Sequence, residues 1–120
     1  MSGATRIAVL EPMLVEIPFR RPVAGVHGTR SSQVSVLLRV ATADGGEGWG
    51  NVDPTPGYSE MSSEEIVAAI GKLAPAVTGL DAFNIHRVLA AMEAVPRCFE
   101  AKGLLEMALW DLKGRALGVP

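Results

Sequence analysis

The stretch LLEMALWDLKGRALGVP, residues 104–120, carries two apolar faces on one predicted helix. At about 100° per residue, one stripe groups Leu105, Ala108, Leu109, Leu112 and Ala116. A second stripe, nearly opposite, groups Met107, Trp110, Gly114 and Leu117. A surface helix of a single domain needs only one apolar stripe, so we expect this helix to pack between two bodies. Gly118 and Pro120 predict that the helix ends here.

Length, charge and cysteine content narrow the class of protein. The 120 residues fit one domain, and a net charge of −2 with scattered Lys and Arg argues against a nucleic-acid partner. No apolar run reaches the roughly 18 residues of a membrane span, and no secretory signal opens the chain. The single cysteine, Cys98, fits a reducing cytosol, so a cytoplasmic location is expected. We interpret Cys98 as a packing residue, with no histidine nearby in sequence to activate it.

The first half of the chain predicts a small sheet. Alternation over residues 6–17 gives a strand whose buried face would be Ile7, Val9, Met13, Val15 and Ile17. Pro12, within that run, suggests an edge strand or a bulge. Residues 33–42 alternate in the same way and predict a second strand. Asp44-Gly45 supplies a hairpin turn, after which residues 46–52 form the returning strand. The pattern predicts three antiparallel strands.

The second half predicts three helices. Ser62 with Glu65 forms a capping box before a helical apolar pattern, and Pro75 is expected to limit that helix. Asp81 is the expected cap of a second helix, which stops before Pro96. The third helix starts near Phe99. Because the strands precede the helices, the class is α+β rather than an alternating parallel sheet.

Two long connections, residues 18–32 and 51–61, are rich in Pro and Gly. Long loops in compact domains are often functional, but composition alone does not separate an ordered lid from a floppy surface loop. His27, in the first connection, is either a substrate contact or a plain exposed residue. Both alternatives stay open at this point.

The residues by themselves identify no active site. The run GGEGWG, residues 45–50, resembles a phosphate loop, but no helix follows it closely, so we interpret its glycines as turn and packing residues. His86 fits a solvated helix histidine better than a ligand or a base. Glu64 and Glu65 suit the start of a helix, and no carboxylate cluster has metal-ligand spacing.

The terminal stretch resembles the N-terminal capping domain of the mandelate racemase/muconate lactonizing enzyme family, in the enolase superfamily. The family typically shows Ala, one residue, Trp-Asp, and then a Gly-x-x-x-Gly-x-Pro ending; the matching residues here are Ala108, Trp110, Asp111, Gly114, Gly118 and Pro120. Ile17-Pro18, GEGWG at 46–50 and KLAPAVTGLDAFNIHRV at 72–88 add support. The resemblance implies an α+β fold, with a three-stranded antiparallel sheet followed by a small helical bundle, over residues 1–120.

The resemblance also implies a function for the full-length enzyme. A (β/α) barrel would follow Pro120 and would carry the Mg²⁺ ligands and the Lys or His acid/base residues, so no catalytic or metal residue is expected in this chain. The reaction would begin with abstraction of a proton α to a carboxylate, leading to racemisation, epimerisation, cycloisomerisation or dehydration. This chain would be inert alone.

By the same resemblance, the capping domain contributes substrate specificity through two lid loops, residues 19–32 and 51–61. The expected contacts to a small carboxylate substrate are Val26, His27, Thr29, Val52, Thr55 and Tyr58. Arg20 or Arg21 is a further candidate for meeting the substrate carboxylate. The expected partners are the C-terminal barrel domain and further copies in a homo-oligomer, with no nucleic acid and no membrane.

The alternative is a stand-alone α+β binding or dimerisation module. In that case Met107, Trp110 and Leu117 would form a homodimer interface, because exposed apolar patches mark interaction sites. Polar substitutions there distinguish the two hypotheses.

Overall fold

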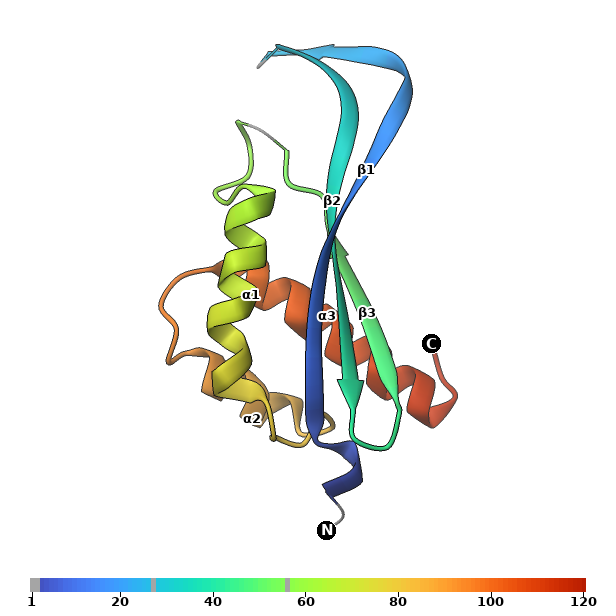
Figure 1. The fold of residues 1–120 in the computed structure, drawn as a ribbon, viewed down its shortest axis with the longest axis vertical. Coiled ribbons are helices and arrows are strands. Elements are labelled where there is room, and N and C mark those ends of the chain that lie inside the picture. Colours follow the sequence, from blue (N-terminus) through green and yellow to red (C-terminus); the bar gives the residue numbers. More distant parts are fainter. Residues whose placement is uncertain (1–2, 27, 56) are drawn as a thin grey trace.

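The sheet and the helices of this protein form separate layers. The computed structural model describes residues 3–26, 28–55 and 57–120. After a short 3-10 turn, η1 (Gly3–Thr5), come β1 (Ile7–Gly25), β2 (Gly28–Thr42), β3 (Glu47–Val52), α1 (Ser63–Val77), α2 (Ile85–Met92) and α3 (Phe99–Leu117). The strands pair antiparallel in the order β1-β2-β3, and the helices lie beside one end of the sheet (Figure 1). The predicted α+β class is confirmed.

The hairpin of β1 and β2 is much longer than predicted. Residues 18–32, expected as a loop, mostly continue the two strands, with Pro18 opposite Ser32 and Val23 opposite Arg30. Between these pairs, residues 19–22 of β1 face the single residue Ser31, which makes a large bulge. A proline has no N–H to donate to the hydrogen-bond ladder, but the ladder is already interrupted at a bulge. A Pro-rich run can therefore still form a strand. We call residues 18–25 and 28–32 the hairpin arm.

The predicted buried face of β1 is wrong beyond Ile7. Ile7 lies opposite Thr42, whereas Val9 lies opposite Ala41, so Ala8 is an extra residue in β1. A one-residue bulge moves every later side chain to the other face. Ile7 is buried in the core, but Val9, Met13, Val15 and Ile17 lie on the sheet face opposite to it.

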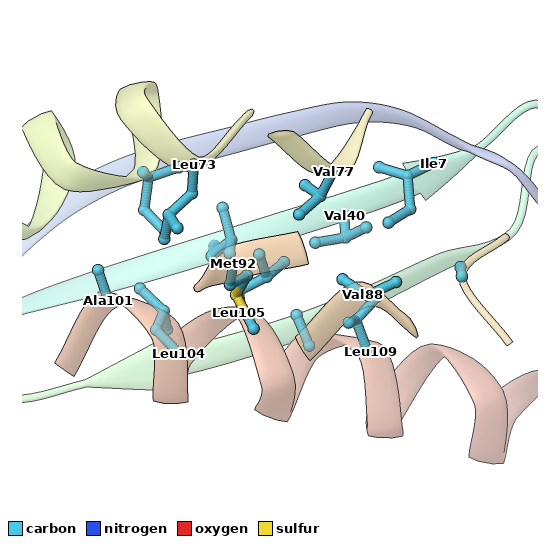
Figure 2. Close-up of a cluster of buried hydrophobic side chains, with 14 of the residues drawn as sticks. Ile7, Val40, Leu73, Val77, Val88, Met92, Ala101, Leu104, Leu105 and Leu109 are labelled. Atoms are coloured by element: carbon cyan, nitrogen blue, oxygen red, sulfur yellow. The ribbon is translucent and has the colours of Figure 1, made fainter. Parts of the chain in front are cut away.

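The core lies between the other face of the sheet and the three helices. Val36, Leu38 and Val40 of β2 are fully buried there. Figure 2 shows the helical side chains that meet them, which include Leu73 and Val77 of α1, Val88 and Met92 of α2, and Leu104, Leu105 and Leu109 of α3. Each large side chain buried in this way contributes about 1.5–3 kcal/mol. The core holds the helices at the base of the hairpin and leaves the arm outside it (Figure 1).

Helix α3 lies along β3 because β3 offers it two glycines. A Cβ on Gly48 would overlap the carbonyl oxygen of Ala108, and one on Gly50 would lie 2.6 Å from that of Leu104. The backbone N–H of Trp49, between the glycines, donates to Asp111 Oδ2 at 2.8 Å. The interpretation of GGEGWG as turn and packing glycines is confirmed, and Asp111 satisfies a donor on the outer edge of the sheet.

The start of α1 is as predicted and its end is not. The Ser62 hydroxyl accepts from Glu65 N at 3.1 Å, and Glu65 Oε1 accepts from Ser62 N at 2.9 Å, which completes the capping box. The helix continues past Pro75 to Val77. Pro75 lies in the last turn, so its missing N–H removes only one hydrogen bond, close to the C-terminus of the helix.

The other two helices also test the predicted boundaries. Asn84, not Asp81, caps α2, accepting from Arg87 N at 3.3 Å. Asp81 instead accepts from Phe83 N at 3.0 Å, which makes a turn before the helix. Helix α3 begins at Phe99 as predicted and ends at Leu117, and Gly118 follows as its C-cap in the left-handed conformation, with a φ of +72°.

Candidate functional site

Two segments far apart in sequence enclose a groove at one end of the molecule. The groove has a volume of about 620 Å³ and runs between the hairpin arm and the residues that connect β3 to α1. Residues 29–32 and 34 line it on one side, and residues between 54 and 65 line it on the other. Both segments lie at the same end of the molecule (Figure 1), and they are the two connections that the sequence analysis identified.

A second, smaller cavity of about 100 Å³ lies beside the groove. Among the described residues, its lining combines apolar groups with a single charged residue, Arg30. The other lining residues are Val23, Gly25, Val26, Gly28, Thr55 and Tyr58. Thr55 and Arg30 line both spaces, so the groove and the cavity are adjacent.

Hydrogen bonds order the connection between β3 and α1. The Thr55 carbonyl accepts from the backbone N–H groups of Tyr58 and Ser59, both at 2.9 Å, and Ser59 Oγ accepts from Thr55 N at 2.9 Å. At its start, Asp53 Oδ1 accepts from Ser35 Oγ at 2.6 Å. At its end, Met61 N donates to Glu100 Oε1 at 3.0 Å. These bonds tie the described residues of this connection to one another, to β2 and to α3.

The charges around the groove are unevenly placed. Glu60, Glu64 and Glu65 lie on its α1 side, and Arg30 lies on its hairpin side. The hydrogen bond from the Ser62 backbone to the Glu65 carboxylate lowers the pKa of Glu65, which favours its ionised form. The groove therefore presents an acidic wall opposite one guanidinium.

The structure brings together four of the six predicted contacts. Thr29 and Thr55 line the groove, and Val26, Thr55 and Tyr58 line the small cavity. Val52 lines neither, because it lies at the end of β3 and packs against the core. His27 lies outside the described residues.

The cation at this site is not one that the sequence singled out. Arg20 and Arg21 are exposed on the bulge and line neither the groove nor the cavity, whereas Arg30 lines both. The pairing register of β1 and β2 is the signal that identifies Arg30. In that register Arg30 lies opposite Val23, and both residues line the small cavity. That pairing depends on the size of the bulge, which residue type alone does not reveal.

The second apolar stripe of α3 lies on the surface of the chain. Leu105, Ala108, Leu109 and Leu112 are buried, as the first stripe predicts, although Ala116 is exposed. Met107, Trp110 and Leu117 are 48%, 52% and 60% exposed. The sheet and the other helices of this chain therefore cover one face of α3, and the opposite face is exposed.

The other candidate residues, His86 and Cys98, lie outside the groove and the cavity. His86 is exposed on α2, which agrees with its interpretation as a solvated helix residue. Cys98 is half-buried against the core, which agrees with its interpretation as a packing residue.

Within residues 3–26, 28–55 and 57–120, no three His, Cys, Asp or Glu side chains gather where they would hold a metal ion. In the same ranges, no helix has the length and apolar character needed to cross a membrane.

The fold and the site together define a class: a small α+β domain whose hairpin arm and connecting segment enclose a groove. Residues 9–120 match the family described as mandelate racemase/muconate lactonizing enzyme, N-terminal domain. The chain belongs to this enzyme family and comprises its N-terminal domain.

Individual relatives agree with this assignment. The chain is 38% identical over 118 residues to a chloromuconate cycloisomerase of Cupriavidus pinatubonensis, covering 95% of this chain and 32% of that protein. It is 38% identical over 118 residues to muconate cycloisomerase 1 of Pseudomonas putida, covering 92% and 31%. The solved muconate lactonizing enzyme of Pseudomonas fluorescens, complexed with muconolactone, superposes with a TM-score of 0.87 at 31% identity, covering 95% and 32%. The chain thus spans about a third of the length of these relatives.

Proposed function

We propose that this chain is the lid domain of a magnesium-dependent enzyme that abstracts a proton α to a carboxylate. The observation that carries the proposal is the groove, because two segments separated in sequence line its opposite sides. A lid of this kind excludes water and shapes the substrate pocket, while catalytic groups elsewhere move the proton. Val26, His27, Thr29, Val52, Thr55 and Tyr58 remain the proposed substrate contacts.

The catalytic groups and the metal ligands would come from a barrel domain that follows this one. The described residues of this chain do not fit a magnesium site, since they hold no cluster of potential ligands. The matched relatives are about three times as long as this chain, which supports a further domain. The exposed stripe of α3 is the surface we assign to the contact with that domain.

Among the four reaction outcomes, the relatives favour cycloisomerisation. The two curated proteins compared above are named as muconate and chloromuconate cycloisomerases. We therefore propose that the substrate is a small unsaturated carboxylate. Homo-oligomer formation by the whole enzyme remains a prediction.

The mass of the natural gene product tests the lid proposal. An immunoblot against this domain, in the cells that make it, should show a band near three times the 12.6 kDa of this chain, because a barrel adds roughly 250 residues. A band at 12.6 kDa would contradict the lid function and would favour the stand-alone module.

A further inference from the structure

The connection between β3 and α1, residues 53–62, leaves the sheet beside the part of β2 that extends past β3. The last pair between these two strands is Val36 with Val52. Next to that pair, Ser35 Oγ donates to Asp53 Oδ1 at 2.6 Å, and Ser35 is only 6% exposed. A buried hydroxyl left without a partner destabilises a fold, so this bond fixes the start of the connection on the sheet.

Gln33 bonds to the connection and to the hairpin arm at the same time. Its Nε2 donates to the carbonyl oxygen of Pro54 at 3.3 Å, and its Oε1 accepts from Arg30 Nη2 at 2.6 Å. The guanidinium carbon of Arg30 lies 5.7 Å from the centroid of the Phe19 ring, which belongs to the other strand of the arm. One amide therefore links the connection to both strands of the arm.

The Gln33 amide is held on both of its polar atoms. In addition to Pro54, its nitrogen donates to the carbonyl oxygen of Val34 at 2.8 Å, while its oxygen accepts from Arg30. The nitrogen and the oxygen of an amide lie in one plane, so the side chain cannot turn away from Pro54 and keep its bond to Arg30 unchanged. A shift of either neighbour therefore alters the bond to the other.

The hairpin arm depends on such links because it lies outside the core. Its described residues are exposed or half-buried, and the helices pack only at the base of the hairpin (Figure 1). Segments with few buried apolar contacts open locally at a low cost in free energy. Polar contacts, such as the bond from Ser32 Oγ to Glu16 Oε2 at 2.7 Å and those of Gln33, therefore contribute much of what fixes the arm.

We propose that Gln33 is a positioning residue that couples the hairpin arm to the connection, so that a displacement of either segment is passed to the other. The physical basis is one continuous set of contacts from Pro54 through the Gln33 amide to Arg30. Use of this coupling to move a lid as one unit rests on the proposed lid function; the coupling itself does not.

The test perturbs the connection and measures the arm. Ser59→Ala removes the hydroxyl that accepts from Thr55 N, a bond that lies within the connection. Amide hydrogen exchange of this 120-residue chain, followed by NMR, should then accelerate at residues 58 and 59, whose N–H groups donate to the Thr55 carbonyl. Because Gln33 transmits the change, exchange in the hairpin arm should also accelerate, by at least about twofold.

Removal of the amide should confine the effect of Ser59→Ala to the connection. Gln33→Met keeps the length of the side chain and removes both bonds, so Ser59→Ala should leave arm exchange unchanged in this background. Gln33→Glu is the second variant, because it keeps an acceptor for Arg30 but has no N–H to donate to Pro54. It should interrupt the transmission as Gln33→Met does. Comparing the effect of Ser59→Ala between backgrounds isolates the coupling from any direct effect of the Gln33 variants on the arm.

The matched control is Ser35→Ala. It removes the other side-chain bond to the connection, that to Asp53, and leaves the Gln33 amide intact. Ser59→Ala should still accelerate arm exchange in this background. The buried amides of Leu38 and Val40 should exchange at the parent rate in each variant, which shows that the core stays folded.

Three results would overturn the coupling. They are an arm that does not respond to Ser59→Ala when Gln33 is present, an equal response after Gln33→Met or Gln33→Glu, and an equal loss of response after Ser35→Ala. The outcome is independent of the lid proposal, because exchange is measured in this chain alone. A gene product of 12.6 kDa would contradict the lid function and leave the coupling untouched. Conversely, a long gene product with an unresponsive arm would sustain the lid function and remove the coupling.

Discussion

Gly48 and Gly50 show how single residues place a whole helix. Without side chains, they let the backbone of α3 approach β3 so closely that a Cβ at either position would clash with a carbonyl oxygen. Asp111, in the same contact, accepts from the Trp49 backbone N–H and pairs with Arg115. These residues of the family pattern therefore have packing and hydrogen-bonding roles in this chain.

Gly48→Ala should destabilise the protein by about 1–3 kcal/mol, since α3 must shift to admit the new methyl group. The matched control is Gly71→Ala, on the exposed side of α1, where a Cβ meets nothing within 4 Å. That change should stabilise the protein by up to about 1 kcal/mol, because Ala is the better helix former. Urea unfolding of both variants measures the difference. A neutral Gly48→Ala would contradict the close packing of α3 on β3.

The elements owe their boundaries to caps and bulges. The capping box of Ser62 and Glu65 starts α1, and Gly118 ends α3. The extra residue Ala8 reverses the faces of β1, and the bulge at 19–22 shifts the register of the hairpin arm. Caps are recognisable from local residue types, whereas bulges depend on how two strands align.

The capping box predicts a pH dependence of stability. The backbone hydrogen bond from Ser62 lowers the pKa of Glu65 in the folded state below its usual 4.5. Folding therefore favours the ionised form, so this contribution is present above about pH 4.5 and is lost as the pH falls through the lower folded pKa. Glu65→Gln should reduce the loss of stability between about pH 5 and pH 3, as measured by urea unfolding at both values.

The control for this prediction is Glu64→Gln. It removes a charge from the same helical turn but leaves the capping box intact, because Glu64 accepts from Ser63 Oγ instead. The Glu64 variant should lose stability with acid nearly as the parent chain does. If both variants flatten the pH dependence equally, the helix dipole rather than the cap is responsible.

One face of the sheet is covered by the helices, whereas the other sheet face and the outer stripe of α3 are exposed. The helices close the core-facing side of the sheet at the base of the hairpin, and the molecule measures 53 × 31 × 18 Å because the arm extends beyond them (Figure 1). The opposite sheet face and the outer stripe of α3 both carry exposed apolar side chains. Such surfaces on a small domain indicate contacts with further structure.

Combined Met107→Gln, Trp110→Gln and Leu117→Gln substitutions distinguish the two hypotheses at this scale. If the stripe contacts a barrel, the variant of this isolated chain should remain monomeric and become more soluble, because an orphaned apolar surface has been removed. If the chain is a stand-alone module, the parent should be a dimer that the variant breaks. Analytical ultracentrifugation of both proteins gives the answer, and a parent dimer dissociated by these changes would contradict the lid function.

The sequence by itself determined the order and type of the elements, the capping box, the start of α3 and its two apolar stripes. These features follow from residue periodicity and from contacts within one turn, so they are legible in a linear chain. The limit expected for α1 at Pro75 comes two residues too early, because a proline is accommodated within the last turn. The cap expected for α2 at Asp81 was wrong, because Asn84 offers an equally good local cap.

Only the tertiary structure decided which face of β1 is buried, how β3 meets α3, and which cation lines the groove. Each of these depends on alignment between segments that are distant in sequence. One extra residue at Ala8 exchanges the faces of β1. Beyond the bulge at 19–22, Arg30 pairs with Val23 and lines the small cavity with Thr55, whereas Arg20 and Arg21 do not. Residue types state what a side chain is able to do, but strand register and packing distances decide what it meets.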